Sequence, residues 1–182
     1  METPINKPYD KDWCYYSDLP SPIHYLNMKE PILIQHKSYP DNRGSYTPIP
    51  LDIEDINWTQ CSISTNDKGG TFRGMHYQTN PPQTKYIKVI KGSIIDFIYD
   101  LNTGELYYYT LNSDNALLIP NHFAHGFLTL EDNTIVTYLV EGEWNPNSEK
   151  SIVWHTIEEL KKIVQENTEG ELIISDKDAN GK

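Results

Sequence analysis

The chain has 182 residues, of which 37% are hydrophobic and 12% aromatic, as expected for one folded domain with a sizeable core. Its formal net charge of -11 leaves no broad basic face, which excludes nucleic acid and anionic membrane surfaces as bulk partners. A small phosphorylated ligand, which needs only two or three cations, remains compatible with this charge.

The first thirty residues differ in composition from the rest of the chain. Residues 1–30 are rich in Pro, Tyr and Asp and show no clear periodicity, which predicts an extended N-terminal arm. Neither the apolar core of a signal peptide nor a run of transmembrane length is found, so we expect a soluble cytoplasmic protein. Cys14 and Cys61 make no disulfide framework and match no metal-binding spacing.

From residue 31 onward the sequence consists of short β-type runs separated by turn signals such as "DNRG", "NDKGG" and "NTGE". The expected strands lie at 31–39, 57–65, 84–92, 93–101, 106–112, 115–121, 126–132 and 134–142. Only residues 156–167 have helical spacing. The pattern predicts a single all-β domain over residues 31–182, a sandwich or barrel of short antiparallel strands.

The stretch "TFRGMHYQTNPPQTKYIKV", residues 71–89, places Arg73, His76 and Lys85 close together in an acidic chain. If "RGMHYQ" is a strand, a period of two puts His76 and Gln78 on one face and Arg73 on the other. The chain has only two arginines, Arg43 and Arg73, so each is expected to have a specific task. A lone His or Lys on a strand is more often structural or solvated, and these residues alone decide nothing.

Further polar groups lie in the strands and loops that follow. Asp96 stands between Ile and Phe in "SIIDFIYDL", where a carboxylate must be paired or hydrogen-bonded. "IPNHFAHGF" adds His122 and His125, expected in a loop, and "TIVTYLV" adds Tyr138. Inward-facing His, Lys, Asp and Tyr could remove a proton next to a carbonyl, and the histidines could alternatively hold a metal ion.

Several of these blocks occur in a characteristic order: "FRGMHYQ", "TKYIKVIKGSIIDFIYDL", "LLIPNHFAHGFLTL" and "TYLV", with "DNRG" before them and "LIISDKDA" after them. Together they resemble the dTDP-4-dehydrorhamnose 3,5-epimerase family of the cupin superfamily, over residues 31–180. The resemblance implies a cupin-type jelly-roll barrel of antiparallel strands with short peripheral helices. It also implies a homodimer and an isomerase that uses neither a metal nor an organic cofactor.

The resemblance implies four catalytic residues. His76 resembles the general base of the family, oriented by Asp178 of the "KDA" block. Tyr138, thirteen residues after His125, resembles the acid on the opposite face of the sugar. Lys85 would stabilise the enolate oxygen.

The substrate implied by the resemblance is a nucleotide-diphosphate sugar. Arg73 would hold the diphosphate, and Arg43 would reach it from the partner subunit of a dimer. The other implied binding residues are Gln60, Gln78, His125, Asp96, Tyr46 and Trp144.

The chemistry of a 4-keto sugar agrees with these roles. The protons on C3 and C5 are both α to the carbonyl, so removal of either gives an enolate. A neutral His is a suitable base near pH 7, and a carboxylate behind it fixes the tautomer. An ammonium aimed at O4 would stabilise the developing charge, and a Tyr on the far face could return a proton to the other side.

Some positions depart from the family pattern and leave alternatives open. Pro48 replaces a Glu that contacts the nucleotide base, and Glu143 replaces an aromatic residue, although Trp144 follows it. A 3,4-ketoisomerase would need the same enolate, and a non-catalytic sugar-binding cupin would need only the fold. A metal-dependent cupin using His76, His122 and His125 lacks the usual "HxH" motif, because the second residue after His76 is Gln78.

Overall fold

A computed structural model of the chain describes residues 29–49, 51, 53 and 56–181. The predicted arm over residues 1–30 lies outside the described residues except for Lys29 and Glu30, and so does Cys14. No helix in the described part is long and apolar enough to cross a membrane.

The described residues form twelve strands and three short helical segments. The strands are β1 (Ile32–Gln35), β2 (Tyr39–Asp41), β3 (Gly44–Tyr46), β4 (Trp58–Asn66), β5 (Phe72–Gln78), β6 (Thr84–Lys91), β7 (Ile94–Asp100), β8 (Leu106–Leu111), β9 (Asn115–Ile119), β10 (Phe123–Thr129), β11 (Thr134–Glu141) and β12 (Glu149–Ser151). The helical segments are η3 (Trp154–Thr156), α1 (Glu158–Glu166) and α2 (Asp176–Asn180).

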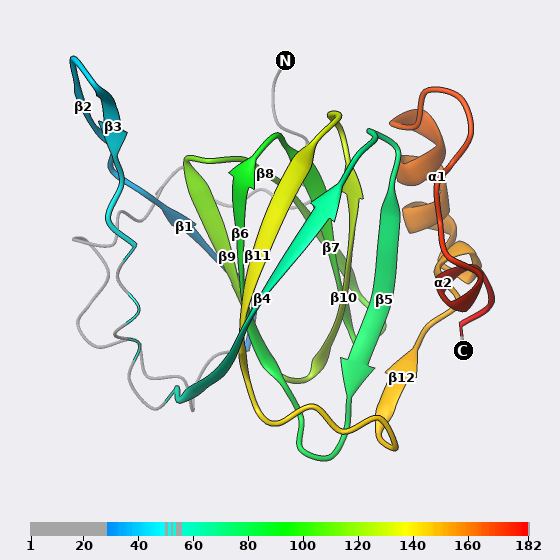
Figure 1. The fold of residues 1–182 in the computed structure, drawn as a ribbon. Helices are drawn as coiled ribbons and strands as arrows, with labels where there is room; N and C mark the ends of the chain where they lie inside the picture. Colours follow the sequence, from blue (N-terminus) through cyan, green and yellow to red (C-terminus); the bar gives the residue numbers. More distant parts are fainter. Residues whose placement is uncertain (1–28, 50, 52, 54–55, 182) are drawn as a thin grey trace.

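Ten of these strands build two five-stranded antiparallel sheets that face each other (Figure 1). The first sheet has the order β1-β9-β6-β11-β4 and the second the order β12-β5-β10-β7-β8, so most neighbours in space are not neighbours in the chain. A separate hairpin of β2 and β3 projects from one end, and α1 and α2 lie beside the second sheet (Figure 1). This arrangement confirms the predicted all-β jelly roll with short peripheral helices.

Three apolar clusters hold the layers together. The inner cluster joins the facing sides of the two sheets, with Ile87, Leu117 and Val136 from the first and Ile98 and Phe127 from the second. On the outside of the second sheet, α1 buries Leu160 and Val164 fully, because apolar residues four apart share one face of a helix. On the outer side of the first sheet, Ile49, Ile53 and Ile56 from the segment before β4 pack in one cluster with strand residues such as Ile34 and Trp58.

The structure corrects the expectation that His125 lies in a loop. Strand β10 begins at Phe123, and all seven of its residues are buried, so His125 lies within a strand in the middle of the second sheet. A strand buried on both faces carries no polar and apolar alternation, which is the signal that sequence reasoning uses. The Ala and Gly residues of "FAHGFLT" weaken that signal further.

A β-bulge in β5 corrects a second expectation, that Arg73 and His76 lie on opposite faces. His125 pairs with His76, but Phe127 pairs with Arg73, so three residues of β10 (125–127) lie opposite four residues of β5 (73–76). The extra residue restores Arg73 to the side of His76, while Phe72, Met75 and Tyr77 pack toward α1. The bulge therefore lets one short strand present both a cation and an imidazole inward.

The bulge requires close approach of Gly74 to Gly126 of β10. A Cβ atom added to Gly126 would lie 2.7 Å from the carbonyl oxygen of Arg73 and 2.8 Å from the sulfur of Met75. We expect Gly126→Ala to lower the free energy of unfolding by about 1–3 kcal/mol, the range for overpacking a well-packed core. Chemical denaturation measures this change. Gly69→Ala is the matched control, because its nearest contact would be 3.3 Å, and an effect as large as that of Gly126→Ala would contradict this account.

Candidate active site

The His76 imidazole is held by a carboxylate from the far end of the chain. Its Nε2 lies 2.7 Å from Oδ1 of Asp178, the residue in α2 that is buried. Ser175 caps α2 by accepting a hydrogen bond from the backbone N–H of Asp178, and the N–H of Gly74 donates to Asp178 Oδ2 at 3.1 Å. Burial opposes ionisation of Asp178, but the bonds from His76 and Gly74 outweigh it and lower its pKa. Asp178 is therefore an anion that fixes the orientation of His76.

Lys85 brings an ammonium group to the same place from the opposite sheet. Its Nζ donates to the backbone carbonyl of His76 at 3.2 Å, which joins β6 of the first sheet to β5 of the second. Burial lowers the pKa of Lys85 to about 8, although the charges of Asp96 and Glu149 oppose the shift. A partly desolvated cation thus lies next to the strand that carries His76.

Asp96 and His125 form a second, fully buried pair. Their side chains are 0% and 5% exposed, and His125 Nε2 lies 2.6 Å from Asp96 Oδ1. Burial raises the pKa of Asp96 and lowers that of His125, so the surroundings favour the neutral form of each group. Asp96 Oδ2 is buried without a hydrogen-bond partner, which leaves one polar atom of the pair available inside the barrel.

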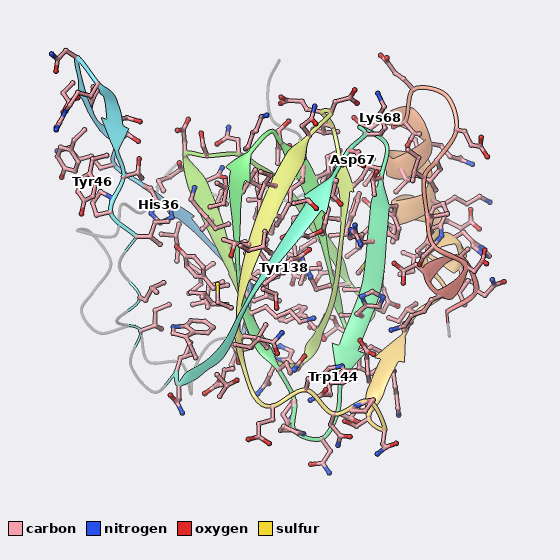
Figure 2. All side chains as sticks on the ribbon, in the orientation of Figure 1. His36, Tyr46, Asp67, Lys68, Tyr138 and Trp144 are labelled. Atoms are coloured by element: carbon pink, nitrogen blue, oxygen red, sulfur yellow. The ribbon has the colours of Figure 1, made fainter. Side chains whose placement is uncertain are left out.

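Tyr138 of β11 lies beside this pair in the middle of the barrel (Figure 2). Its ring stands edge-on to that of His125, with centroids 6.2 Å apart. Burial and the nearby Asp96 charge raise its pKa, while a hydrogen bond with Ser64 and the charge of Arg73 act in the other direction. Tyr138 is therefore a protonated phenol at neutral pH.

The register of the strands explains why these groups meet. In the second sheet, His76 of β5 lies opposite His125 of β10, and the next inward position of β10, Phe127, lies opposite Asp96 of β7. Residues that pair across antiparallel strands project from the same face, so the side chains converge on the inner side. Lys85 and Tyr138 reach the same space from the adjacent strands β6 and β11 of the first sheet.

Three predicted site residues lie away from this group. Arg43 is at the tip of the β2–β3 hairpin, where its 85% exposed guanidinium pairs with Asp41 at 2.6 Å. Tyr46 on β3 is 69% exposed, and Trp144 in the loop before β12 is 60% exposed. In Figure 2 both lie well apart from Tyr138. Within one chain, the structure does not bring Arg43 or Tyr46 to His76.

The two predicted glutamines differ in their surroundings. Gln78 is buried, and its amide donates to the carbonyls of Pro81 and Glu143 and accepts from the N–H of Asn145. These bonds secure the backbone on both sides of Trp144, so in this structure Gln78 holds a loop rather than offering a free amide. Gln60, on β4, is exposed and donates to Ser62 Oγ at 2.6 Å.

The alternative of a metal site finds no ligand set in the described residues. No group of three or more His, Cys, Asp or Glu side chains there is arranged to hold a metal ion. The ring of His122 packs against Phe123, with centroids 4.3 Å apart. His76 and His125 each contact a carboxylate instead.

A comparison with known families identifies the chain. The sequence profile described as dTDP-4-dehydrorhamnose 3,5-epimerase matches residues 25–182. The chain belongs to this family. The matched residues include all of the described barrel and both carboxylate–imidazole pairs.

Individual members of the epimerase family support this assignment. An epimerase from Methanothermobacter thermautotrophicus is 32% identical over 168 residues, which cover 83% of this chain and 88% of the relative. A Mycobacterium tuberculosis epimerase is 34% identical over 110 residues, which cover 56% of this chain but only 52% of the relative, about half its length.

The fold also matches that of a solved family member. The crystal structure of dTDP-6-deoxy-D-glucose-3,5-epimerase from Legionella pneumophila, in complex with dTDP-4-keto-L-rhamnose, has a TM-score of 0.73 and 26% identity. The match covers 85% of this chain and 88% of that one.

Sequence reasoning missed two polar residues of β4 that join the epimerase-family site. Asn66 accepts a hydrogen bond from Arg73 Nε at 2.8 Å, and Ser64 bonds to Tyr138. The signal for both was present in "QCSISTN", where Gln60, Ser62, Ser64 and Asn66 alternate with other residues along one face. The expected strand over residues 57–65 ended one residue short of Asn66.

Proposed function

We propose that the protein is an epimerase that inverts C3, C5 or both in a nucleotide-diphosphate 4-keto-6-deoxy sugar. The observation that carries this proposal is the contact between Lys85 Nζ and the backbone of His76, whose imidazole is held by Asp178. A base and a cation at one place suit removal of a proton next to a carbonyl, because the cation stabilises the enolate oxygen as charge develops.

The proposed reaction has two proton transfers. His76 removes a proton from a carbon next to C4, and the electron pair of the C–H bond moves to O4 of the enolate beside Lys85. The imidazolium is stabilised by Asp178, whose lowered pKa keeps it anionic. Tyr138 then returns a proton to the same carbon from the other face. The scheme involves no net oxidation or reduction, and the protonated His76 and ionised Tyr138 return to their starting states by exchanging protons with solvent.

The substrate class is supported by the cations and by family membership. Arg73, an exposed residue on the same side of β5 as His76, contributes a guanidinium that can bind a diphosphate through more than one N–H. The Legionella pneumophila relative is described in complex with dTDP-4-keto-L-rhamnose, which supports a thymidine nucleotide here. The cytoplasmic location expected from the sequence stays a prediction.

The test is solvent deuterium exchange. The protein is incubated with dTDP-4-keto-6-deoxyglucose in D2O, and loss of the C3 and C5 proton signals is followed by NMR. Exchange with inverted product supports the proposal and identifies which carbon is inverted. Exchange at C3 with migration of the keto group would indicate a 3,4-ketoisomerase. An absence of exchange with dTDP-, GDP- and UDP-linked sugars would contradict the proposal and favour a sugar-binding cupin.

We further propose a homodimer in which Arg43 completes the site of the partner subunit. The hairpin of β2 and β3 extends away from the barrel (Figure 1), and its arginine is highly exposed. Tyr39 and Tyr46 on the same hairpin are 50% and 69% exposed, as expected for apolar surface that a second subunit would cover.

Mixing two inactive variants tests whether Arg43 acts across subunits. In a dimer of Arg43→Ala with His76→Ala, one site retains both groups if Arg43 comes from the partner. Random mixing then restores about a quarter of wild-type activity, because half of the dimers are mixed and each has one intact site. No recovery after mixing, together with a dimer in light scattering, would indicate that Arg43 acts within its own chain, and full activity of Arg43→Ala alone would indicate that Arg43 has no role in the site.

A further inference from the structure

The proposed chemistry makes no use of Asn66, although this side chain is in direct contact with Arg73. Asn66 is the last residue of β4 and only 3% exposed. Its Oδ1 accepts a hydrogen bond from Arg73 Nε at 2.8 Å. A buried amide that touches the cation assigned to the diphosphate can influence how that cation is presented.

The Asn66 amide is fixed in one orientation by the neighbouring strand. Its Nδ2 donates to the backbone carbonyl of Thr134 at 3.1 Å, and Thr134 is its direct partner in the β4–β11 ladder. Thr134 is itself fully buried. Because the Asn66 amino group donates to this carbonyl, the amide oxygen faces Arg73 and accepts from its Nε–H.

These contacts leave most N–H donors of the Arg73 guanidinium available to a ligand. Asn66 takes the Nε–H, and the backbone carbonyl of Thr65 takes one Nη2 hydrogen at 3.4 Å. A guanidinium has five N–H donors, so three remain. Because an amide and a carbonyl are neutral acceptors, the positive charge of Arg73 is not cancelled. In the described part of the chain no carboxylate forms an ion pair with Arg73, whereas Arg43 is paired with Asp41.

We propose that Asn66 is a positioning residue that holds Arg73 by its Nε, so that the free Nη hydrogens of the uncancelled cation face an anionic diphosphate. This inference rests on the proposed function, because it assigns the diphosphate to Arg73. Two-point support of the side chain by Asn66 and Thr65 restricts the rotation of a long, flexible residue before the ligand arrives. Less conformational entropy is then lost on binding.

The same strand connects this support to the proposed acid. Ser64 Oγ lies 3.4 Å from Asn66 Oδ1 and also bonds to Tyr138. Arg73, Asn66, Ser64 and Tyr138 thus form a continuous polar row that joins the proposed diphosphate-binding cation to the proposed acid. Asn66 bonds to Arg73 directly and is connected to Tyr138 only through Ser64, so its removal is expected to affect ligand binding more than the chemical step.

Titration calorimetry with thymidine diphosphate, and with inorganic pyrophosphate as a probe without a base, tests the proposal. We expect Asn66→Ala to weaken both ligands about 10- to 150-fold, in line with one hydrogen bond to a charged group. We expect Asn66→Asp to weaken them more, because its carboxylate would pair with Arg73 and compete with the ligand. In steady-state kinetics KM should rise while kcat stays near that of the wild type.

Two controls separate positioning from a general structural effect. Asn115 is also a buried Asn whose amide bonds to backbone groups, at Asn112 and Thr110, so Asn115→Ala should cost stability without changing ligand affinity. In an Arg73→Lys background, which lacks the Nε and the fork, Asn66→Ala should add little further loss.

The proposal is overturned if Asn66→Ala binds both ligands as the wild type does. It is also overturned if the loss is equally large in the Arg73→Lys background. The proposed function itself is tested separately, by deuterium exchange with the wild-type protein. Because the ratio of variant to wild-type affinity is also measured with pyrophosphate, a wrong nucleotide base would leave this test intact.

Discussion

Replacing His76 by Ala is expected to abolish deuterium exchange at the carbon that the protein inverts. General base catalysis typically contributes about 10²–10⁴-fold, and His76 is the imidazole whose own backbone carbonyl accepts the Lys85 hydrogen bond. The rate of exchange, followed by NMR in D2O, should fall by at least that factor. The affinity for thymidine diphosphate should change little, because the proposed phosphate contact belongs to Arg73 rather than to His76.

Asp178→Asn provides the companion measurement. The amide keeps the size of the side chain but removes the charge that would stabilise the imidazolium, and it can favour the wrong tautomer of His76. We expect the exchange rate to fall by up to about 10⁴-fold, as in Ser-His-Asp triads, and by no more than in His76→Ala.

Unchanged exchange in His76→Ala would assign the base to another residue, and His125 would be tested next.

The fold was largely predictable because its strands carry strong local signals. Runs such as "TKYIKVIKG" and "TIVTYLVEG" alternate in polarity and end at turn residues, and they appear as β6 and β11. Strand β10 was placed too late in the chain because burial on both faces removes that alternation. The helix α2 has only five residues and carries almost no periodic signal.

The site was predictable only in part, for reasons that concern distance along the chain. His76 and Asp178 are 102 residues apart, and no local pattern joins them, so their pairing came from the family resemblance. The β-bulge that turns Arg73 inward inserts one residue into a strand, and a strict period of two cannot anticipate it. Asn66 and Arg73 are only seven residues apart, but their contact depends on this bulge, so a strict period of two does not predict it.

Lys85→Met is expected to lower catalytic activity without lowering the stability of the fold. Loss of a donor aimed at a developing oxyanion typically lowers kcat by about 10²–10³-fold. The same residue weakens the fold at neutral pH, because burial lowers its pKa to about 8 from the usual value near 10.5. We therefore expect the variant to lose exchange activity while its free energy of unfolding at pH 7 stays the same or rises by about 2 kcal/mol.

The pH dependence follows from the sign of this shift. The unfolded chain binds the Lys85 proton more tightly than the folded chain. Burial of the charged Lys85 therefore lowers the free energy of unfolding by its full amount below pH 8, and this loss disappears as the pH rises toward 10.5. The stability difference between Lys85→Met and the wild type should shrink over that range in urea titrations. Above pH 8 the stability of the wild type rises, whereas its kcat/KM should fall because the Lys85 ammonium is lost.

Lys85→Arg is the variant that decides whether the charge itself is responsible. A guanidinium stays protonated far above pH 8, so the fall in kcat/KM on the alkaline side should move to higher pH in this variant even if its maximum rate is lower. The raised pKa of Tyr138 keeps the phenol protonated over the same range, and its ionisation does not produce the fall. An alkaline limb that is the same in Lys85→Arg and the wild type would show that another group titrates, and the enolate-stabilising role of Lys85 would then have to be abandoned.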